Sequence, residues 1–439
     1  MEELFMKKIL ALLLCVALVA ALFVGCGSGT QSTTTTGAPS NGDTDAPDDG
    51  GEANTPDSGN ASDIKIGAVL VGDENEGYTY AHILGLQEAL SNLGLTEANI
   101  VWKYSIPEDE TCKDAIVDCI DQGCTLVFTN SYGHQSFAQQ AAEEYPDVQI
   151  VAMTGDTAKA SGLANFHNAF TKIYEARYAA GVVAGMKVKE LVDAGKLSDK
   201  NYDADGNVKI GYVGAYPYAE VVSGYTAFYL GIKSVYEKVS MEVQYTNSWF
   251  NITAENEAAV ALIADGCCII GQHADSTGAP SACEEALAAG TTVYSVGYNV
   301  DMLSVAPNAA LVSPTNEWGV YYTYAIGAVM NGESFETNWA EGFDQDAVAL
   351  TELGPNVAEG TKEAVDDVIA KLKDGSLHVF DTATFTVGGQ PVTSAFATDT
   401  DGDFAPDADE AIIDGYYHES YFQSAPSFQL RIDGITELN

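Results

Sequence analysis

The strongest constraint on the fold is a pattern of short apolar runs that alternate with helical stretches, and this pattern occurs twice along the chain. The first occurrence predicts strands over residues 64–71, 100–104, 125–129 and 148–153, with helices over 78–92 and 108–121. The second predicts strands over residues 209–214, 241–245, 268–271 and 292–296, with helices over 219–238, 254–264 and 279–289. Alternating strands and helices build parallel sheets, and unbroken apolar runs fit strands that are covered on both faces. We therefore predict an α/β protein with two lobes, each with a mostly parallel sheet flanked by helices.

A short sequence pattern that occurs once in each half of the chain supports the two-lobe interpretation. One predicted helix ends at Gly123 and another ends at Gly266, and an apolar strand follows each glycine at once. Glycine suits these positions because it readily adopts the left-handed conformation that ends many helices. This repeated helix–glycine–strand pattern favours two lobes of similar architecture.

The strand ends indicate where a ligand would bind. Open parallel sheets bind ligands beyond the carboxyl ends of their strands, and pockets form preferentially between domains. The segments expected to leave the strands are residues 72–80, 130–134, 154–156, 165–168, 214–218, 247–250, 272–277 and 297–302.

These segments combine aromatic rings with carboxylates and amides. The candidate ligand-binding residues are Asp73, Asn75, Tyr78, Ser131 and Tyr132 in the first lobe, and Trp249, Phe250, Gln272, Asp275 and Asp301 in the second. Stacking on an aromatic face is worth about 1–3 kcal/mol per base, and polar groups read ring edges or hydroxyls. The set predicts a neutral, planar, hydrogen-bonding ligand, whereas the alternative is that Trp249 and Phe250 are core residues.

The chain is strongly acidic. It has 19 Lys and Arg residues against 63 Asp and Glu residues, which gives a formal net charge of -44. Because this charge repels phosphate, nucleic acid and anionic nucleotides are disfavoured as partners. The length of 439 residues suits two or three domains.

The N-terminus resembles a bacterial lipoprotein signal. Lys7 and Lys8 precede an apolar run over residues 9–23, which is shorter than the roughly 20 residues that span a membrane. Small residues then lead into Cys26, the expected lipidation site. The alternative is an ordinary signal peptide with an incidental cysteine. Residues 26–63 are polar and lack Lys and Arg, so we expect a disordered tether.

The sequence gives little support for disulfides, metal binding or catalysis. Six cysteines remain beyond Cys15 and Cys26, namely Cys112, Cys119, Cys124, Cys267, Cys268 and Cys283. Without a CxxC pair we expect buried free thiols and no metal site, with a disulfide inside one lobe as the alternative. Residues 399–403 resemble a calcium loop, but Gly402 is misplaced, which favours a solvated acidic turn. Enzyme motifs are absent, so we expect neither catalysis nor a cofactor.

The region from residue 64 onward resembles the basic membrane protein (BMP) family, lipoproteins that bind purine nucleosides and related purines for ABC importers. The resemblance lies in the ordered segments NFHNAF (165–170), YEARY (174–178), GVVAG (181–185), NSWF (247–250), QHADS (272–276) and GYNVDM (297–302). It implies a type I periplasmic-binding fold with three crossovers and a hinge that closes on the ligand.

The resemblance also implies roles for individual residues. Trp249 would stack on the base and Asp301 would accept hydrogen bonds from the ligand. Tyr78 and Tyr132 would line the first lobe, and Gln272 and Asp275 would complete the second. The first loop departs from the family, because nucleoside-binding members often carry an Asp followed by a Ser-Phe-Asn stretch, whereas residues 72–78 contain a Tyr and no Phe. A free base such as adenine therefore stays open as the ligand. The acidic segment 399–410 also departs from the family.

The predicted organisation and function follow. We expect a signal peptide over 1–25, a tether over 26–63, a first lobe over 64–168 with a return segment at about 300–335, and a second lobe over 169–299 with a C-terminal segment at about 336–439. The leading hypothesis is a monomeric, lipid-anchored extracytoplasmic receptor that delivers a purine nucleoside or base to an ABC permease and ATPase. The alternatives are a receptor or sensor for a sugar or other small molecule on the same fold, and a nucleoside hydrolase.

Overall fold

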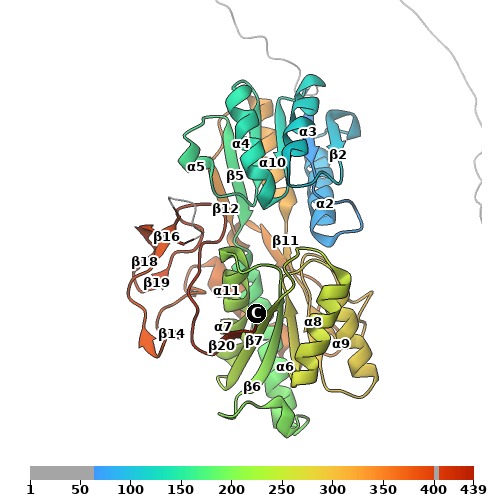
Figure 1. Ribbon diagram of the computed structural model, residues 1–439, viewed down its shortest axis with the longest axis vertical. Coiled ribbons are helices and arrows are strands. Elements are labelled where there is room, and N and C mark those ends of the chain that lie inside the picture. The colour runs from blue at the N-terminus through green and yellow to red at the C-terminus, as the bar shows by residue number, and fades with distance from the viewer. Residues whose placement is uncertain (1–63, 400–404) are drawn as a thin grey trace, which may run out of the picture. The chain divides into compact units, whose positions relative to one another are not determined.

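The computed structural model describes residues 64–399 and 405–439. The predicted signal peptide, the tether, the lipidation site at Cys26 and nearly all of the predicted acidic turn at 399–403 lie outside these residues. Two six-stranded sheets, one in each lobe, organise the described chain (Figure 1).

Both sheets are parallel throughout; their first five strands in chain order are arranged alike, whereas the sixth strand is added at opposite edges of the two sheets. The first runs β12 (Asn338–Glu341), β5 (Phe166–Thr171), β4 (Gln149–Met153), β3 (Leu126–Thr129), β1 (Ile66–Val69) and β2 (Ile100–Lys103). The second runs β10 (Ala310–Val312), β9 (Tyr294–Val296), β8 (Ile269–Gln272), β6 (Val208–Gly214), β7 (Val239–Tyr245) and β20 (Ile435–Glu437). The prediction of two α/β lobes with parallel sheets is confirmed.

Helices cover both faces of each sheet. The first lobe carries α2 (Gly77–Asn92), α3 (Glu110–Asp121), α4 (Gln135–Glu144), α5 (Ala158–Ser161) and α10 (Trp318–Asn331). The second carries α6 (Ile173–Asp193), α7 (Ala219–Val235), α8 (Ile252–Asp265), α9 (Gly278–Ala288) and α11 (Thr361–Lys373). Short 3₁₀ turns are η2 (Glu97–Asn99), η3 (Tyr132–His134), η4 (Asp199–Asn201) and η5 (Phe343–Gln345).

The apolar strand runs are explained by burial on both faces. In β1, Ile66 and Ala68 pack into the core beside α2 and α10, whereas Val69 packs beside α3 and α4 on the opposite face. Successive strand residues point to opposite faces, so a strand covered on both sides needs apolar residues throughout. The predicted helix ends are confirmed as well, because Gly123 has φ of 93° and Gly266 has φ of 107°.

The long helices α6 and α7 pack with their backbones in direct contact. A Cβ atom on Gly181 would lie 2.3 Å from the Phe228 carbonyl oxygen, and one on Gly231 would lie 2.1 Å from the Tyr178 carbonyl oxygen. Any larger residue would therefore force the helices apart. The glycines of the GVVAG segment thus have a packing role in the second lobe.

The chain passes between the lobes three times. The first passage joins β5 to α6 at Lys172, and the other two run through β11 (Pro314–Asn316) and β13 (Val348–Leu350), which pair antiparallel. The observed lobe bounds differ from the predicted ones at two strands. β10 lies in the predicted return segment to the first lobe but belongs to the second sheet, and β12 lies in the predicted second-lobe segment but belongs to the first sheet. Residues 165–168 were expected in a loop, but most of this segment lies in β5, where β4 and β12 flank it.

Beyond α11, the described residues 378–399 and 405–439 form a C-terminal segment that lies beside both lobes (Figure 1). Its small antiparallel pairs are β14 (Thr386–Val387) with β15 (Gln390–Pro391), β16 (Phe396–Thr398) with β17 (Ala408–Glu410), and β18 (Ile412–Ile413) with β19 (Tyr416–Tyr417). It contacts the first lobe through a hydrogen bond from the Ser424 hydroxyl to the Gly155 carbonyl oxygen, 2.9 Å. The segment then returns to the second sheet as β20.

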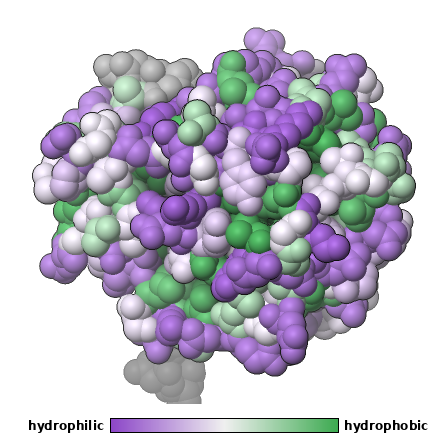
Figure 2. All heavy atoms as spheres, turned by 90° about the horizontal axis from the view of Figure 1, so that it is seen from below, coloured by the Kyte–Doolittle hydropathy of each residue, from purple (hydrophilic) through white to green (hydrophobic). Residues whose placement is uncertain are grey.

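The surface at the second-lobe end is mixed in character. Hydrophilic side chains cover most of this face, with smaller apolar patches between them (Figure 2). Within the described residues, no helix is both long enough and apolar enough to span a bilayer.

Candidate ligand-binding site

A cavity of about 470 Å³ lies between the lobes at the carboxyl ends of their strands. Its lining includes eight of the ten predicted binding residues, namely Asp73, Asn75, Tyr78, Ser131, Tyr132, Trp249, Phe250 and Asp275. Strand exits in a parallel sheet converge at one edge, which explains why residues distant in sequence meet here. Their roles toward a ligand stay predictions.

The backbone is strained around this cavity. Four non-glycine residues at the strand exits, Ser105, Thr154, Asn247 and Asn299, have φ between 55° and 63°. Left-handed backbone is costly for such residues, above all for the β-branched Thr154, and it concentrates at functional sites. Ser105 and Thr154 line the cavity directly, and Asn247 immediately precedes the Ser248–Phe250 part of the wall.

The second lobe presents an aromatic wall. The Trp249 ring lies 5.3 Å from the Tyr216 ring at an interplanar angle of 64°, and Tyr216 stacks on Tyr218 at 5.1 Å. The Trp249 carbonyl oxygen accepts a hydrogen bond from the Asp275 backbone N–H at 2.8 Å, which fixes the loop. Trp249 packs against the core and also lines the cavity, whereas Phe250 is 40% exposed.

The first lobe presents a wall of carboxylates and hydroxyls. Asp73 Oδ1 accepts hydrogen bonds from the Asn75 backbone N–H at 2.9 Å and from Asn75 Nδ2 at 2.8 Å. These bonds favour the ionised carboxylate and hold the pKa of Asp73 below its usual range. Glu76 accepts a hydrogen bond from the Thr79 hydroxyl, but burial raises its pKa.

Three hydroxyls of the first-lobe wall are already oriented. Tyr78 donates to the Asn130 carbonyl oxygen. Ser131 donates to Glu108 Oε1 at 2.5 Å, and Tyr132 donates to Asp156 Oδ2 at 3.1 Å. Burial raises the pKa of the Tyr132 hydroxyl, so it stays protonated at neutral pH.

Asp275 is the buried carboxylate of the second-lobe wall and is 7% exposed. Its Oδ1 atom accepts a hydrogen bond from Asn299 Nδ2 at 2.8 Å, and Oδ2 has no hydrogen-bond partner among the described residues. Burial and the neighbouring Glu76, Glu255 and Glu220 carboxylates raise the pKa of Asp275 well above its usual range.

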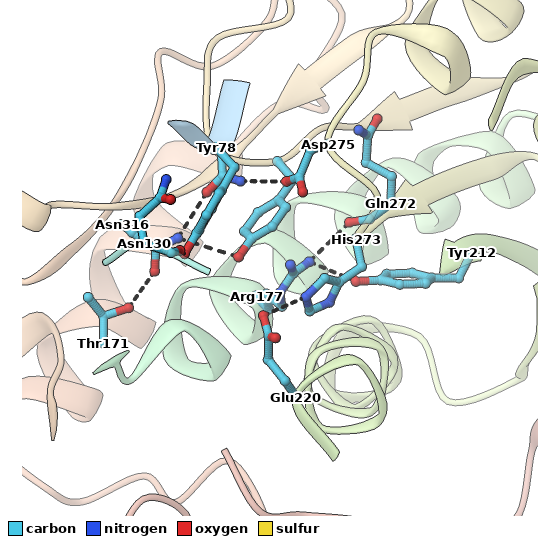
Figure 3. Close-up of polar contacts among 12 residues, drawn as sticks. Tyr78, Asn130, Thr171, Arg177, Tyr212, Glu220, Gln272, His273, Asp275 and Asn316 are labelled. Atoms are coloured by element: carbon cyan, nitrogen blue, oxygen red, sulfur yellow. Dashed lines mark hydrogen bonds and ion pairs between the residues drawn. The ribbon is translucent and has the colours of Figure 1, made fainter. Parts of the chain in front are cut away.

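A buried chain of hydrogen bonds links Asp275 to two of the passages between the lobes (Figure 3). Asn299 Oδ1 accepts from Asn316 Nδ2 at 2.9 Å, and Asn316 Oδ1 accepts from the Thr171 hydroxyl at 2.5 Å. Asn316 ends β11 and Thr171 ends β5. The orientation of a cavity carboxylate therefore depends on residues of the hinge.

A buried arginine supports the second-lobe wall from behind (Figure 3). Arg177 Nη1 donates to the Tyr212 hydroxyl at 2.7 Å and to the Gln272 carbonyl oxygen at 3.0 Å. Its guanidinium lies 3.9 Å from the centre of the Tyr298 ring, which lines the cavity. His273 Nε2 lies 2.8 Å from Glu220 Oε1, and burial lowers the pKa of His273 to about 4. The imidazole is therefore neutral at neutral pH.

Two predicted binding residues lie away from the cavity. The Gln272 amide is buried and donates to the carbonyl oxygens of Ala274 and Ser276 at 2.7 and 3.0 Å, so it stabilises its own loop. Asp301 is exposed, and its carboxylate accepts a hydrogen bond from the Leu303 backbone N–H at 2.9 Å. Neither side chain is part of the lining in this conformation.

The structure adds lining residues that were not singled out from the sequence. Ser105 and Glu108 follow β2, a strand whose exit is not among the expected binding segments, and Glu220 is in the first turn of α7. Treating β2 like the other strands would have found the first two.

The cavity is acidic. Five carboxyl side chains line it, namely Asp73, Glu76, Glu108, Glu220 and Asp275, and none of the described lining residues is Lys or Arg. A site of this composition repels phosphate and attracts groups that donate hydrogen bonds.

The cysteines lie in the core. All six cysteines of the described residues are buried and free, and most sit at helix ends or strand starts. In the same part of the chain, no group of three or more His, Cys, Asp or Glu side chains could hold a metal ion.

Two parallel α/β lobes, three passages between them and a cavity at the facing strand ends define the class of two-lobed solute-binding proteins. The family model for PnrA-like ABC transporter substrate-binding proteins (Bmp) matches residues 65–377. The chain therefore belongs to this family, whose members bind substrates outside the cytoplasm for ABC transporters.

Individual relatives agree with this assignment. A purine-binding protein of Brucella abortus is 30% identical over 318 residues, which is 72% of this chain and 83% of that protein. A Haloferax volcanii protein named as an ABC transporter glucose-binding protein is 30% identical over 59% of this chain and 60% of its own length. A solved solute-binding protein of Conexibacter woesei aligns with a TM-score of 0.56 at 19% identity, covering 72% of this chain and 98% of that chain. This last likeness shows the fold alone.

Proposed function

We propose that the cavity between the lobes binds a purine nucleoside or a purine base. The observation that carries this proposal is the pairing of an aromatic wall around Trp249 with an opposite wall of carboxylates and oriented hydroxyls. A planar heterocycle stacks on the first and donates hydrogen bonds from its edge to the second. The 30% identical purine-binding relative supports this choice.

Ligand binding would then shift the protein toward a closed state. A ligand that contacts both walls stabilises the conformation in which they lie together, and the lobes turn about the three passages. The closed state would be recognised by the permease of an ABC importer, which takes over an unchanged ligand.

We also propose that Cys26 is acylated and tethers the binding lobes to the extracytoplasmic face of the membrane. The support is the sequence itself, in which a basic start, an apolar run and small residues precede Cys26. More than one acyl chain gives stable anchoring. Mass spectrometry of the protein from native membranes should show a diacylated N-terminal peptide beginning at Cys26, whereas an unmodified Cys26 would refute the anchor.

A calorimetric ligand panel tests the purine proposal. Adenine, adenosine, inosine, guanosine, AMP and glucose are each titrated into the protein without its first 63 residues, and thermal shifts are measured in parallel, since a ligand raises the melting temperature by mass action. We expect at least one nucleoside or base to bind and AMP not to bind. Saturation by glucose without any purine response would instead match the name of the Haloferax volcanii relative and refute the proposal.

A second measurement separates binding from hydrolysis. The bound nucleoside is recovered after prolonged incubation and analysed by chromatography. We expect an intact nucleoside, and stoichiometric release of free base would identify a nucleoside hydrolase instead.

A further inference from the structure

A second, smaller cavity adjoins the ligand cavity and shares part of its wall. This side compartment has a volume of about 290 Å³ and shares Tyr132, Thr154 and Glu220 with the main cavity. The Tyr218 ring lines the compartment and lies 6.1 Å from both the Tyr132 ring and the Trp249 ring. An aromatic ring of the compartment therefore lies close to two aromatic rings of the main cavity.

The outer wall of the side compartment comes from the C-terminal segment. Its lining from this segment is Ala397, Asp399, Gln423, Ala425, Pro426, Ser427 and Gln429. These residues lie beyond the part of the chain that the family model matches, which ends at residue 377. The compartment is thus built partly from a region that the family match does not cover.

This outer wall is packed in place. Ser424 is buried and bonds to Gly155 of the first lobe, and Ala425 and Ser427 are also buried. The buried Glu419 accepts hydrogen bonds from the Phe428 N–H and the Ser427 hydroxyl, both at 3.2 Å. A wall held by buried hydrogen bonds keeps a defined shape, as a binding site requires.

The chemistry of the compartment suits a neutral polar group. Side-chain amides and hydroxyls are provided by Gln135, Thr157, Gln423, Ser427 and Gln429, and carboxylates by Asp156, Glu220 and Asp399. None of its described lining residues is Lys, Arg or His. Hydroxyl groups can donate to these acceptors and accept from the amides, whereas a phosphate would meet three carboxylates.

We propose that the side compartment binds a neutral, hydroxyl-bearing substituent of the ligand, such as a pentose, while the heterocycle occupies the main cavity beside Trp249. The inference rests on the proposed purine function. Tyr132, Thr154 and Glu220 line both spaces, so a ligand seated against them reaches the main cavity and the compartment together. The C-terminal segment therefore selects nucleosides over free bases and over nucleotides.

The test fills the compartment without touching the main cavity. Ala160 is exposed on α5 and lines the compartment but not the main cavity, so Ala160→Tyr places a ring there and Ala160→Ser is the matched control. Adenosine and adenine are titrated into each protein by calorimetry. We expect Ala160→Tyr to weaken adenosine binding by about tenfold or more, the value of a few lost hydrogen bonds, with adenine affinity within about twofold. The Ala160→Ser protein should match the parent for both ligands.

A second variant tests the amides of the outer wall. Gln423→Ala combined with Gln429→Ala removes two polar side chains without adding bulk, and should also reduce the preference for adenosine over adenine. If the unaltered protein binds adenosine and neither variant changes that affinity, the side compartment is refuted while the purine function stands. If the unaltered protein binds no purine at all, the proposed function itself fails.

Discussion

The two walls of the cavity differ in chemistry and in the hydrogen bonds that hold their carboxylates. The first-lobe wall consists of carboxylates and hydroxyls, several of them on the exposed loop that holds Asp73 and Asn75. The second-lobe wall combines aromatic rings around Trp249 with the carboxyl groups of Glu220 and the buried Asp275. From this difference we expect the second lobe to stack on the flat face of a ligand and the first lobe to form hydrogen bonds with its edge.

The support behind the walls differs as well. Asp275 is tied through Asn299 and Asn316 to the passages between the lobes, whereas the Asp73 carboxylate bonds only to its neighbour Asn75 among the described residues. A buried network is costly to disturb, and an exposed hydrogen bond contributes little. We therefore expect substitutions in the second-lobe wall to cost more affinity than substitutions in the first.

The largest expected effect is that of Trp249→Ala. Loss of the stacking surface should weaken adenosine binding by about tenfold to a hundredfold, as stacking is worth about 1–3 kcal/mol per base. Isothermal calorimetry measures the change. The matched control is Trp102→Ala on edge strand β2, where Trp102 stacks on Tyr104 outside the cavity lining. Unchanged binding by the Trp249 variant would remove this residue from the site.

The next effect is that of Asp275→Asn, together with its pH dependence. A ligand that donates to Asp275 favours its ionised form, so binding releases a proton and affinity should fall as pH drops below the raised pKa. The variant should bind about tenfold more weakly at pH 8, the value of a hydrogen bond to a charged group, with a flatter profile. The control is Glu175→Gln, because burial raises the pKa of Glu175 to about 7 but it does not line the cavity. A variant that keeps the parent's pH profile would contradict this role.

Asp275→Asn should weaken ligand binding but increase the stability of the ligand-free protein. In the ligand-free protein the raised pKa means that the folded state holds a proton that the unfolded state has lost at pH values above 3.8. Unfolding therefore becomes easier as pH rises from that value toward the raised pKa of Asp275. Asp275→Asn removes this penalty, so its melting temperature at pH 8 should exceed that of the parent, with little difference near pH 4. A lower melting temperature at pH 8 would argue that Asp275 serves structure more than binding.

The smallest expected effect is that of Asp73→Asn. Asp73 is only half-buried, so solvent screens the interactions of its carboxylate and adenosine binding should weaken by about threefold or less. The control is Asp109→Asn, since the exposed Asp109 likewise accepts a hydrogen bond from a residue two positions on, away from the cavity. A loss as large as that of the Trp249 variant would overturn the contrast between the walls.

Much of the fold could be predicted because its signals are local. Strand runs such as Ile66–Val69 and the glycines that end helices follow from backbone geometry and burial on two faces. The strand β5 was missed in part because its polar residues His167 and Asn168 resemble a loop. In the folded protein they are buried and bond to Glu336, Gln149, Ala158 and Ala152.

The sequence by itself determined the two parallel lobes and the strand exits at which binding residues gather, because these depend on periodicity along the chain. Only the tertiary structure decided which side chains face the cavity. Gln272 turns to its own loop and Asp301 to solvent, whereas Glu108 and Glu220 reach the wall from a neighbouring strand exit and a helix start. Side-chain direction depends on partners far away in the sequence, and the same reason places the C-terminal segment beside Gly155, a contact that no local pattern encodes.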